Sequence, residues 1–310
     1  MTKHLFHVVL LGVVAFGPKL MAQSQPASNG VPVHMVVTVE ARKGNDVPEI
    51  TREDVKGYQG KEKRPTMDWV PLRGEHAGME FFILIDDGLT TNVGTQLDDI
   101  RQFINGQPAT TAIGVAYMRD GTAQVVQNPT TDHAQAAKAL RLPIGEPGIN
   151  ASPYFSVTDL IKRWPAQAVR RETLMITDGV DRFYGGGLND PYLDEAVATA
   201  QKAGVIIYSI YSPGVGHYGR SYWRVNWAQN YLSQLSEETG GESFYMGFGP
   251  PVSFGPYLEQ LSRRLEHQYL LSFAATPEKK DSLQRVKLRT EVPNAELIAA
   301  DAVYIPATSQ

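Results

Sequence analysis

Two stretches of this sequence read as strands that are buried on both faces, and each leads into an aspartate. Residues 81–85 form an unbroken apolar run that is followed by Asp86-Asp87-Gly88, and residues 172–177 are followed by Asp178-Gly179. Unbroken apolar runs of this kind are typical of parallel strands covered by helices on both sides. Amphipathic patterns separate the apolar runs, so strand and helix alternate from 79 to 266. This alternation predicts a doubly wound, mostly parallel α/β domain over 79–266.

The segments on either side of this domain carry β-strand signals. The N-terminal segment, 31–78, begins with an alternating apolar face made of Val31, Val33, Met35, Val37 and Val39. The C-terminal segment, 267–310, contains three β-like runs at 268–274, 283–290 and 296–304. Each set of strands is too small to be stable alone. We therefore expect them to pair into one β-sandwich, with the α/β domain inserted between its two halves.

The first 22 residues have the pattern of a secretory signal peptide. A cationic start precedes an apolar run of about 13 residues and a small residue, Ala22. The run is shorter than the roughly 20 residues that span a bilayer. Residues 23–30 are a polar linker, and we expect no membrane span after cleavage. The sequence predicts a secreted or periplasmic protein, and it contains no cysteine that could carry a lipid anchor.

Composition excludes several classes of function. A formal charge of −4 has the wrong sign for a protein that grips nucleic-acid phosphates. The absence of cysteine excludes thiol nucleophiles and cysteine-ligated metals. Residues 214–219 match G-x-G-x-x-G, but bulky residues follow them and the next strand has no terminal acid, so we expect no nucleotide. No G-x-S-x-G or H-E-x-x-H motif occurs, which favours a protein that is not an enzyme.

The strand-end aspartates suggest a cation site. In doubly wound sheets, ligands bind beyond the carboxyl ends of the strands, where Asp86 and Asp178 are expected. Thr90 lies four residues after Asp86, and Ser152 lies in a turn that opens a helix. Carboxylate and hydroxyl oxygens suit Mg²⁺ or Mn²⁺. The alternative from spacing alone is that the aspartates only start turns or cap helices.

These segments resemble those of von Willebrand factor type A domains. The first strand and its loop, the second loop, the Thr-Asp-Gly strand and the late Thr-Gly-Gly turn lie at 82–90, 149–154, 174–179 and 235–241. Outside the domain, 50–55 and 268–273 are similar to the flanks of an exported subfamily that is abundant in Acidobacteria. The resemblance covers nearly the whole chain after the signal peptide. It implies the same α/β fold and a metal-ion-dependent adhesion site.

The resemblance implies a metal shell made of Asp86, Thr90, Ser152 and Asp178. Gly88 departs from the family pattern, because it stands where the family has a serine ligand. Water could fill that place, since Mg²⁺ usually keeps several waters, at some loss of affinity. Asp87 either adds an oxygen or points away.

A segment rich in aromatic residues and arginine supplies candidate contacts to a partner. Within it we single out His217, Tyr218, Arg220, Tyr222 and Trp223. Tyrosine, tryptophan and arginine are the residues that most often anchor interfaces. The alternative is that Trp223 and Trp227, four residues apart, bury one face of a helix.

The sequence thus predicts an exported, non-catalytic recognition protein. In this hypothesis Mg²⁺ or Mn²⁺ leaves one coordination position open for an acidic side chain of an unknown protein partner, and the aromatic segment adds contacts around it. The first alternative is a metal-independent scaffold or adhesion module that relies on residues 217–227. The second is an envelope hydrolase that uses Asp178 or His217.

Overall fold

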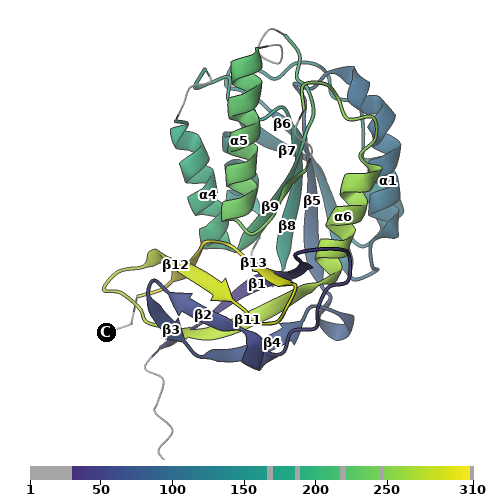
Figure 1. Cartoon of the computed structure of the whole chain (residues 1–310). Coiled ribbons are helices and arrows are strands. Elements are labelled where there is room, and N and C mark those ends of the chain that lie inside the picture. The colour runs from purple at the N-terminus through teal and green to yellow at the C-terminus, as the bar shows by residue number, and fades with distance from the viewer. Residues whose placement is uncertain (1–29, 166–169, 186–188, 217–220, 245–246, 308–310) are drawn as a thin grey trace, which may run out of the picture.

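The computed structural model describes residues 30–165, 170–185, 189–216, 221–244 and 247–307. Within them, a central sheet has the order β10-β9-β8-β5-β6-β7 (Figure 1). The strands are β5 (Met79–Asp86), β6 (Thr111–Arg119), β7 (Thr122–Thr130), β8 (Arg171–Thr177), β9 (Val205–Tyr211) and β10 (Ser243–Phe244). Strand β7 pairs antiparallel with β6, and the other pairings in this sheet are parallel. The expected doubly wound α/β class is confirmed.

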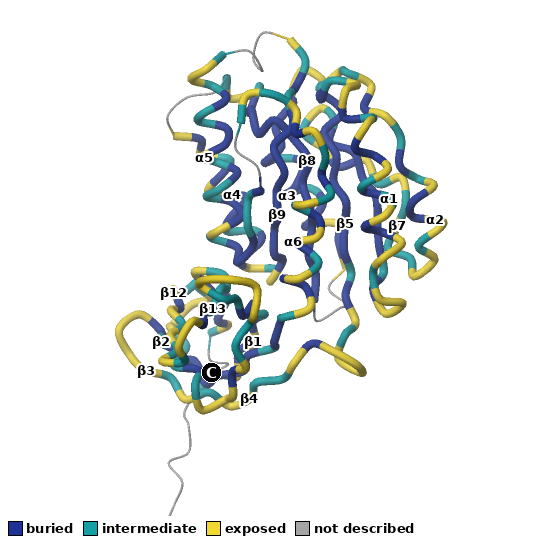
Figure 2. Tube along the Cα trace, turned by 45° about the vertical axis from the view of Figure 1, so that its right-hand side comes forward, coloured by how far each residue is buried: buried dark blue, intermediate teal, exposed yellow. Residues whose placement is uncertain are grey.

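Helices cover both faces of this sheet. Alternate residues of β5 point to opposite sides, so Phe81 and Ile83 join one core while Phe82 and Leu84 join the other. The first face is covered by α1 (Leu97–Gly106), α2 (His133–Lys138) and α6 (Gly255–Glu266). The second is covered by α3 (Pro153–Arg163), α4 (Pro191–Ala203) and α5 (Tyr222–Glu238). The central strands are therefore buried along most of their length (Figure 2).

The N- and C-terminal segments pair with each other beneath this domain (Figure 1). One sheet has the order β13-β1-β11-β4 and the other has the order β14-β12-β2-β3. These strands are β1 (Val31–Ala41), β2 (Lys56–Gln59), β3 (Glu62–Arg64), β4 (Thr66–Pro71), β11 (Gln268–Ala275), β12 (Ser282–Arg289), β13 (Ala295–Ile298) and β14 (Ala302–Ile305). Apolar side chains of both sheets share one core, which makes them the expected β-sandwich.

The run expected at 296–304 is not one strand. It divides into β13 and β14, which belong to different sheets of the sandwich. Between them, Ala300 forms a β-bridge with Thr239, and the N–H of Asp301 donates to the carbonyl of Glu238. The chain thus crosses from one sheet to the other while it is held against the end of α5.

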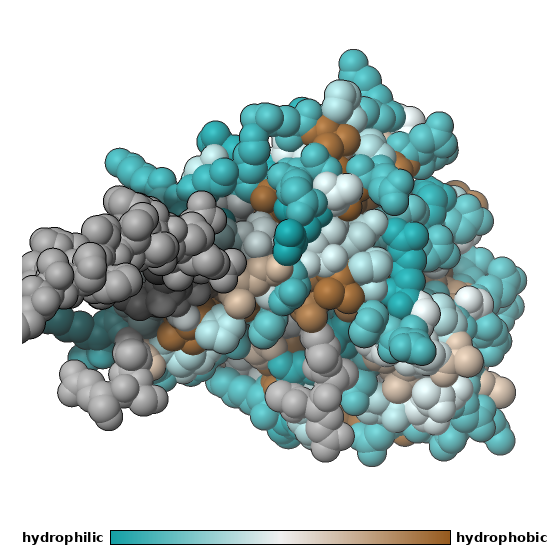
Figure 3. Space-filling view, turned by 90° about the horizontal axis from the view of Figure 1, so that it is seen from below, coloured by the Kyte–Doolittle hydropathy of each residue, from teal (hydrophilic) through white to brown (hydrophobic). Residues whose placement is uncertain are grey.

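The other short elements in the described residues are the 3-10 helices η1 (Arg52–Asp54), η2 (Gly74–His76) and η3 (Thr91–Gln96). The predicted signal peptide, 1–22, and all but the last residue of the linker lie outside the described residues. In the described part of the chain, no helix combines the length and apolar character needed to span a bilayer. Seen from the sandwich end, the described surface is mostly hydrophilic, with scattered apolar residues (Figure 3).

Candidate functional site

The carboxyl ends of β5 and β8 bring Asp86 and Asp178 together, at the end of the domain opposite the sandwich. The Oγ1 of Thr177, the last residue of β8, donates to Oδ2 of Asp86 at 2.8 Å. The backbone N–H of Gly88 donates to Oδ1 of Asp86 at 2.7 Å. Burial, and after it the negative charge of Asp178, raise the pKa of Asp86 above its ordinary value. Two buried acids therefore share this rim.

Arg182 neutralises Asp178. Its Nη2 lies 2.5 Å from Oδ2 of Asp178, and its Nη1 lies 3.2 Å from Oδ1. The N–H of Val180 also donates to Oδ1 of Asp178, at 3.0 Å. The side chain of Arg182 is only 9% exposed and that of Asp178 only 1%. Both oxygens of Asp178 are thus engaged by donors of the chain itself.

Ser152 reaches the same rim from the start of α3. Its Oγ accepts the N–H of Phe155 at 3.3 Å, which makes it the N-cap, and Pro153 takes the first helical position. Its hydroxyl donates a hydrogen bond to Oδ2 of Asp181, with 2.6 Å between the two oxygens. Ser152, Asp86 and Arg182 line one hollow of about 10 Å³. This volume is at the lower limit for a single water molecule, which needs roughly 10–15 Å³.

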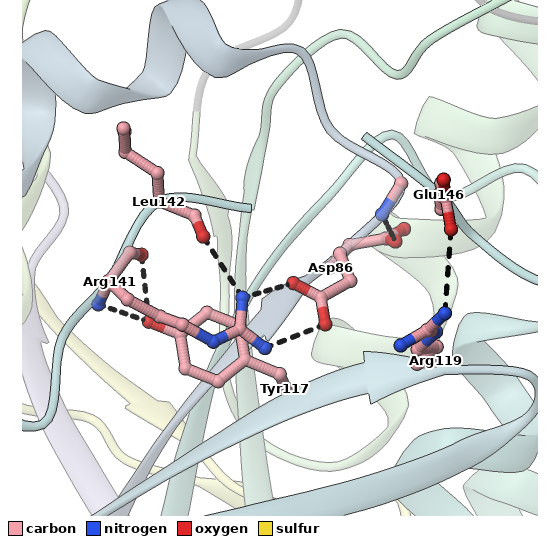
Figure 4. A network of polar contacts seen from close by, with 8 residues as sticks. Asp86, Tyr117, Arg119, Arg141, Leu142 and Glu146 are labelled. Atoms are coloured by element: carbon pink, nitrogen blue, oxygen red, sulfur yellow. Dashed lines mark hydrogen bonds and ion pairs between the residues drawn. The ribbon is translucent and has the colours of Figure 1, made fainter. Parts of the chain in front are cut away.

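A second arginine neutralises Asp87. The two terminal nitrogens of Arg141 lie 2.6 and 2.8 Å from the two carboxylate oxygens of Asp87, which is fully buried. The guanidinium lies over the ring of Tyr117, 3.7 Å from its centre (Figure 4). The hydrogen bonds with Asp87 raise the pKa of Arg141. Asp87 is therefore held by Arg141 and does not line the hollow beside Asp86.

Thr90 and Gly88 lie in the loop after β5. The N–H of Thr90 donates to the carbonyl of Pro213 at 3.1 Å, but Thr90 does not line the hollow. A Cβ at position 88 would lie 2.7 Å from the Cβ of Pro147 and 3.0 Å from Oδ1 of Asp86. A serine could not occupy this position without displacing Pro147.

The oxygens at this rim do not fit a divalent cation in this arrangement. Asp178 binds a guanidinium, Ser152 donates to another acid, and Asp86 accepts two hydrogen bonds. Among the described residues, no group of three or more histidine, aspartate or glutamate side chains is arranged to hold a metal ion. The structure brings together three of the four predicted ligands. It also adds Arg182, which the sequence analysis did not single out.

Exposed aromatic side chains lie in the segments that follow the strands ending at this rim. Of the predicted partner-binding residues, His217, Tyr218 and Arg220 lie outside the described residues. Tyr222 and Trp223 begin α5, and their rings contact each other at 5.5 Å between centres. Phe248 stacks on Tyr222 at 5.2 Å. Phe183 and Tyr184 extend the set, and the five described residues are between 44% and 65% exposed.

We name these five residues, Phe183, Tyr184, Tyr222, Trp223 and Phe248, the aromatic rim. Each of them follows the carboxyl end of β8, β9 or β10 in the chain, which explains why all five lie at the same end of the sheet. Trp223 is exposed, so the alternative that it buries a helix face is wrong for this residue. Phe183, Tyr184 and Phe248 were not predicted as contact residues from the sequence, although Phe183 and Tyr184 lie shortly after Asp178-Gly179.

Gly214, the first glycine of the G-x-G-x-x-G match, has a packing role. It forms a β-bridge with Leu89, and the N–H of Val215 donates to the carbonyl of Gly88 at 2.8 Å. A Cβ at position 214 would overlap Oδ2 of Asp178 and lie 2.6 Å from Nη2 of Arg182. Among the described residues, the helix that follows is α5, which begins at Tyr222. The glycine thus makes room for the ion pair.

A neighbouring acid, Asp190, gives a prediction on pH. It caps α4 through Oδ1, which accepts the N–H of Tyr192 at 3.0 Å, while no donor among the described residues reaches Oδ2. Burial, followed by the charge of Asp181, raises the pKa of Asp190 from 3.8 to about 6. Because the folded state holds this proton more tightly than the unfolded state, Asp190 makes stability fall as pH rises through this window.

Asp190→Asn is therefore expected to raise the free energy of unfolding by about 1–3 kcal/mol at pH 7.5 and to have little effect at pH 4. Asparagine keeps the N-cap, and its amide can donate to Asp181. Urea unfolding at both pH values measures the difference. Asp190→Ala, which loses the cap, is the control and is expected to gain less. An equal gain from Asp190→Asn at pH 4 and 7.5 would contradict the raised pKa.

No family model matches this chain, and no curated protein matches it. Among solved structures, it is similar to an aerotolerance-related membrane protein from Bacteroides fragilis that carries multiple mutations to serine. That similarity has 12% identity and a TM-score of 0.45, and covers 61% of this chain and 98% of the other.

Two further similar structures are a von Willebrand factor type A protein from Catenulispora acidiphila and the VWA domain of SpRpn10. The first shares 10% identity at a TM-score of 0.44, over 91% of this chain and 75% of that one. The second shares 15% identity at a TM-score of 0.40, over 59% and 94%. All three likenesses are distant.

Proposed function

We propose that this chain is an exported, non-catalytic recognition protein of the von Willebrand factor type A kind, which binds a protein partner at the carboxyl edge of its α/β sheet. The observation that carries the proposal is the aromatic rim. Large aromatic side chains are costly to leave in water, and tyrosine and tryptophan are the most frequent anchors of interfaces. Phe248 stacks on Tyr222, and the rings of Tyr222 and Trp223 meet edge to face. All three rings are exposed, so another surface can cover them.

The contacts of the acids favour the metal-independent form of this function. Recognition through a metal ion needs carboxylate oxygens that are free to coordinate it. Both oxygens of Asp178 bind donors within the chain, and Ser152 donates to Asp181. Mg²⁺ or Mn²⁺ binding at Asp86, Thr90, Ser152 and Asp178 stays a prediction from the family resemblance. The proposal here relies on the aromatic rim instead.

No specific observation favours the envelope hydrolase. Asp178 is held by Arg182 and is 1% exposed, so its oxygens are unsuited to proton transfer with a substrate. His217, the other residue considered for catalysis, lies outside the described residues. Export and the absence of catalysis are both parts of the proposal that rest on the sequence.

The proposal predicts that Tyr222→Ser with Trp223→Ser weakens partner binding at least about tenfold, because two interface anchors are lost. The mature chain, immobilised, is used to capture proteins from the envelope fraction of its own cells. The captured partner is then purified, and its affinity for each variant is measured by surface plasmon resonance. Met67→Ser, which changes an exposed apolar residue of the sandwich, is the matched control and is expected to bind like the unchanged chain.

The same measurement in EDTA separates the two forms of the function. An unchanged affinity supports the metal-independent form, whereas loss of binding in EDTA would favour the metal-dependent one. Normal binding by the double serine variant would mean that the aromatic rim is not the interface.

A further inference from the structure

We propose that the guanidinium of Arg182 is a resident cation, which takes the place that a divalent metal ion would hold between Asp86, Ser152 and Asp178. The protein's own side chain thus closes a latent metal site. The inference concerns the charge balance of the rim and does not depend on the partner in the proposed function.

The guanidinium of Arg182 lies at the place where a metal ion would bind. Arg182 binds both oxygens of Asp178 and also lines the hollow that Asp86 and Ser152 share. A two-point contact between a guanidinium and a carboxylate fixes the arginine more firmly than a single contact would. The hollow that remains measures about 10 Å³. One water molecule needs roughly 10–15 Å³ by this measure, and a magnesium ion usually keeps several waters, so the hollow beside Arg182 is too small for a hydrated ion.

The neighbouring backbone is built around the arginine. Residue 214 passes so close to the Asp178–Arg182 pair that a Cβ there would overlap the carboxylate. On the other side of the hollow, Pro147 approaches Gly88 so closely that the serine expected of an adhesion site has no room. Two glycines thus accommodate the arrangement, one beside the ion pair and one beside Asp86.

Charge gives the third step. Arg182 forms an ion pair with Asp178, while the oxygens of Asp86 accept from an uncharged hydroxyl and a backbone N–H. Removing the guanidinium leaves buried acid groups without this positive charge, and opens the volume that the side chain filled. The groups left around that space are carboxylate and hydroxyl oxygens, which are the ligands that Mg²⁺ and Mn²⁺ prefer.

The test is Arg182→Ala in the full mature chain, with thermal unfolding followed in EDTA and in 10 mM MgCl₂, and Mn²⁺ binding measured by electron paramagnetic resonance. The unchanged protein is expected to bind no Mn²⁺ and to shift its Tm by less than about 1 °C. The variant is expected to unfold earlier in EDTA and to gain about 5 °C or more in Mg²⁺, as expected for a ligand well above its Kd. It is also expected to bind one Mn²⁺.

Two variants control for side effects. Arg182→Lys keeps a cation and is expected to show no metal response, and Arg182→Ala combined with Asp178→Asn is expected to lose the response. Stoichiometric binding of Mn²⁺ by the unchanged protein would overturn the proposal. The proposal would also be overturned if Arg182→Ala and Arg182→Gln both folded but showed no metal response. Failure of both variants to fold, in Mg²⁺ as well as in EDTA, would overturn it too. Folding of Arg182→Ala only in Mg²⁺ would support it.

Discussion

Gly214→Ala is expected to lower the free energy of unfolding by about 3–5 kcal/mol, the loss typical of breaking a buried ion pair. The new Cβ would overlap Oδ2 of Asp178 and lie 2.6 Å from Nη2 of Arg182. The Asp178 side chain is 1% exposed, so it cannot move into water without displacing the loop that covers it. Chemical unfolding in urea, followed by circular dichroism, measures the loss.

Gly78→Ala is the matched control for this prediction. No heavy atom lies within 4 Å of a Cβ built at position 78. This substitution is therefore expected to change the free energy of unfolding by less than about 1 kcal/mol, through backbone entropy alone. If Gly214→Ala unfolded at the same urea concentration as the unchanged protein, the close packing of residue 214 on the ion pair would be wrong.

Most of the fold could be predicted from local sequence patterns, such as helical periodicity and turn dipeptides. The spacing of Leu97, Ile100, Phe103 and Ile104 is typical of one helix face, and all four are buried on α1. An Asp-Gly dipeptide between apolar runs is typical of a hairpin turn, and Asp120 and Gly121, which join β6 to β7, have the positive φ, 52° and 73°, that such a turn requires. The division of 296–304 could not be foreseen. It depends on long-range contacts of Ala300 and Asp301 with the end of α5.

The site was only partly accessible to sequence reasoning. Strand order places Asp86 and Asp178 at one edge of the sheet whatever their side chains contact. Their partners depend on side-chain directions, which spacing does not reveal. Arg141, the partner of Asp87, is 54 residues away along the chain. The pairing of Arg182 with Asp178 could have been predicted, because Arg182 lies only four residues after Asp178 and carries the positive charge that a buried acid needs.

Arg170→Met is expected to lower the free energy of unfolding by about 3–5 kcal/mol, because it leaves the buried Glu172 without its counter-charge. The Nε of Arg170 lies 2.9 Å from Oε1 of Glu172, and its Nη2 donates to the carbonyl of Leu265 at 2.7 Å. Gln268, from β11 of the sandwich, donates to Oε2 of Glu172 at 3.3 Å. The ion pair therefore lies where the α/β domain meets the sandwich, and urea unfolding measures its loss.

A double-mutant cycle separates the ion pair from simple loss of packing. Glu172→Gln combined with Arg170→Met removes both charges, so the double variant is expected to be more stable than Arg170→Met alone. Arg52→Met is the exposed comparison, since its pair with Glu53 lies in water and is worth less than about 1 kcal/mol. Strictly additive losses in the cycle would mean that the pair does not stabilise the junction. A favourable coupling would show that its charge, and not only the alkyl chain of Arg170, joins the two parts of the molecule.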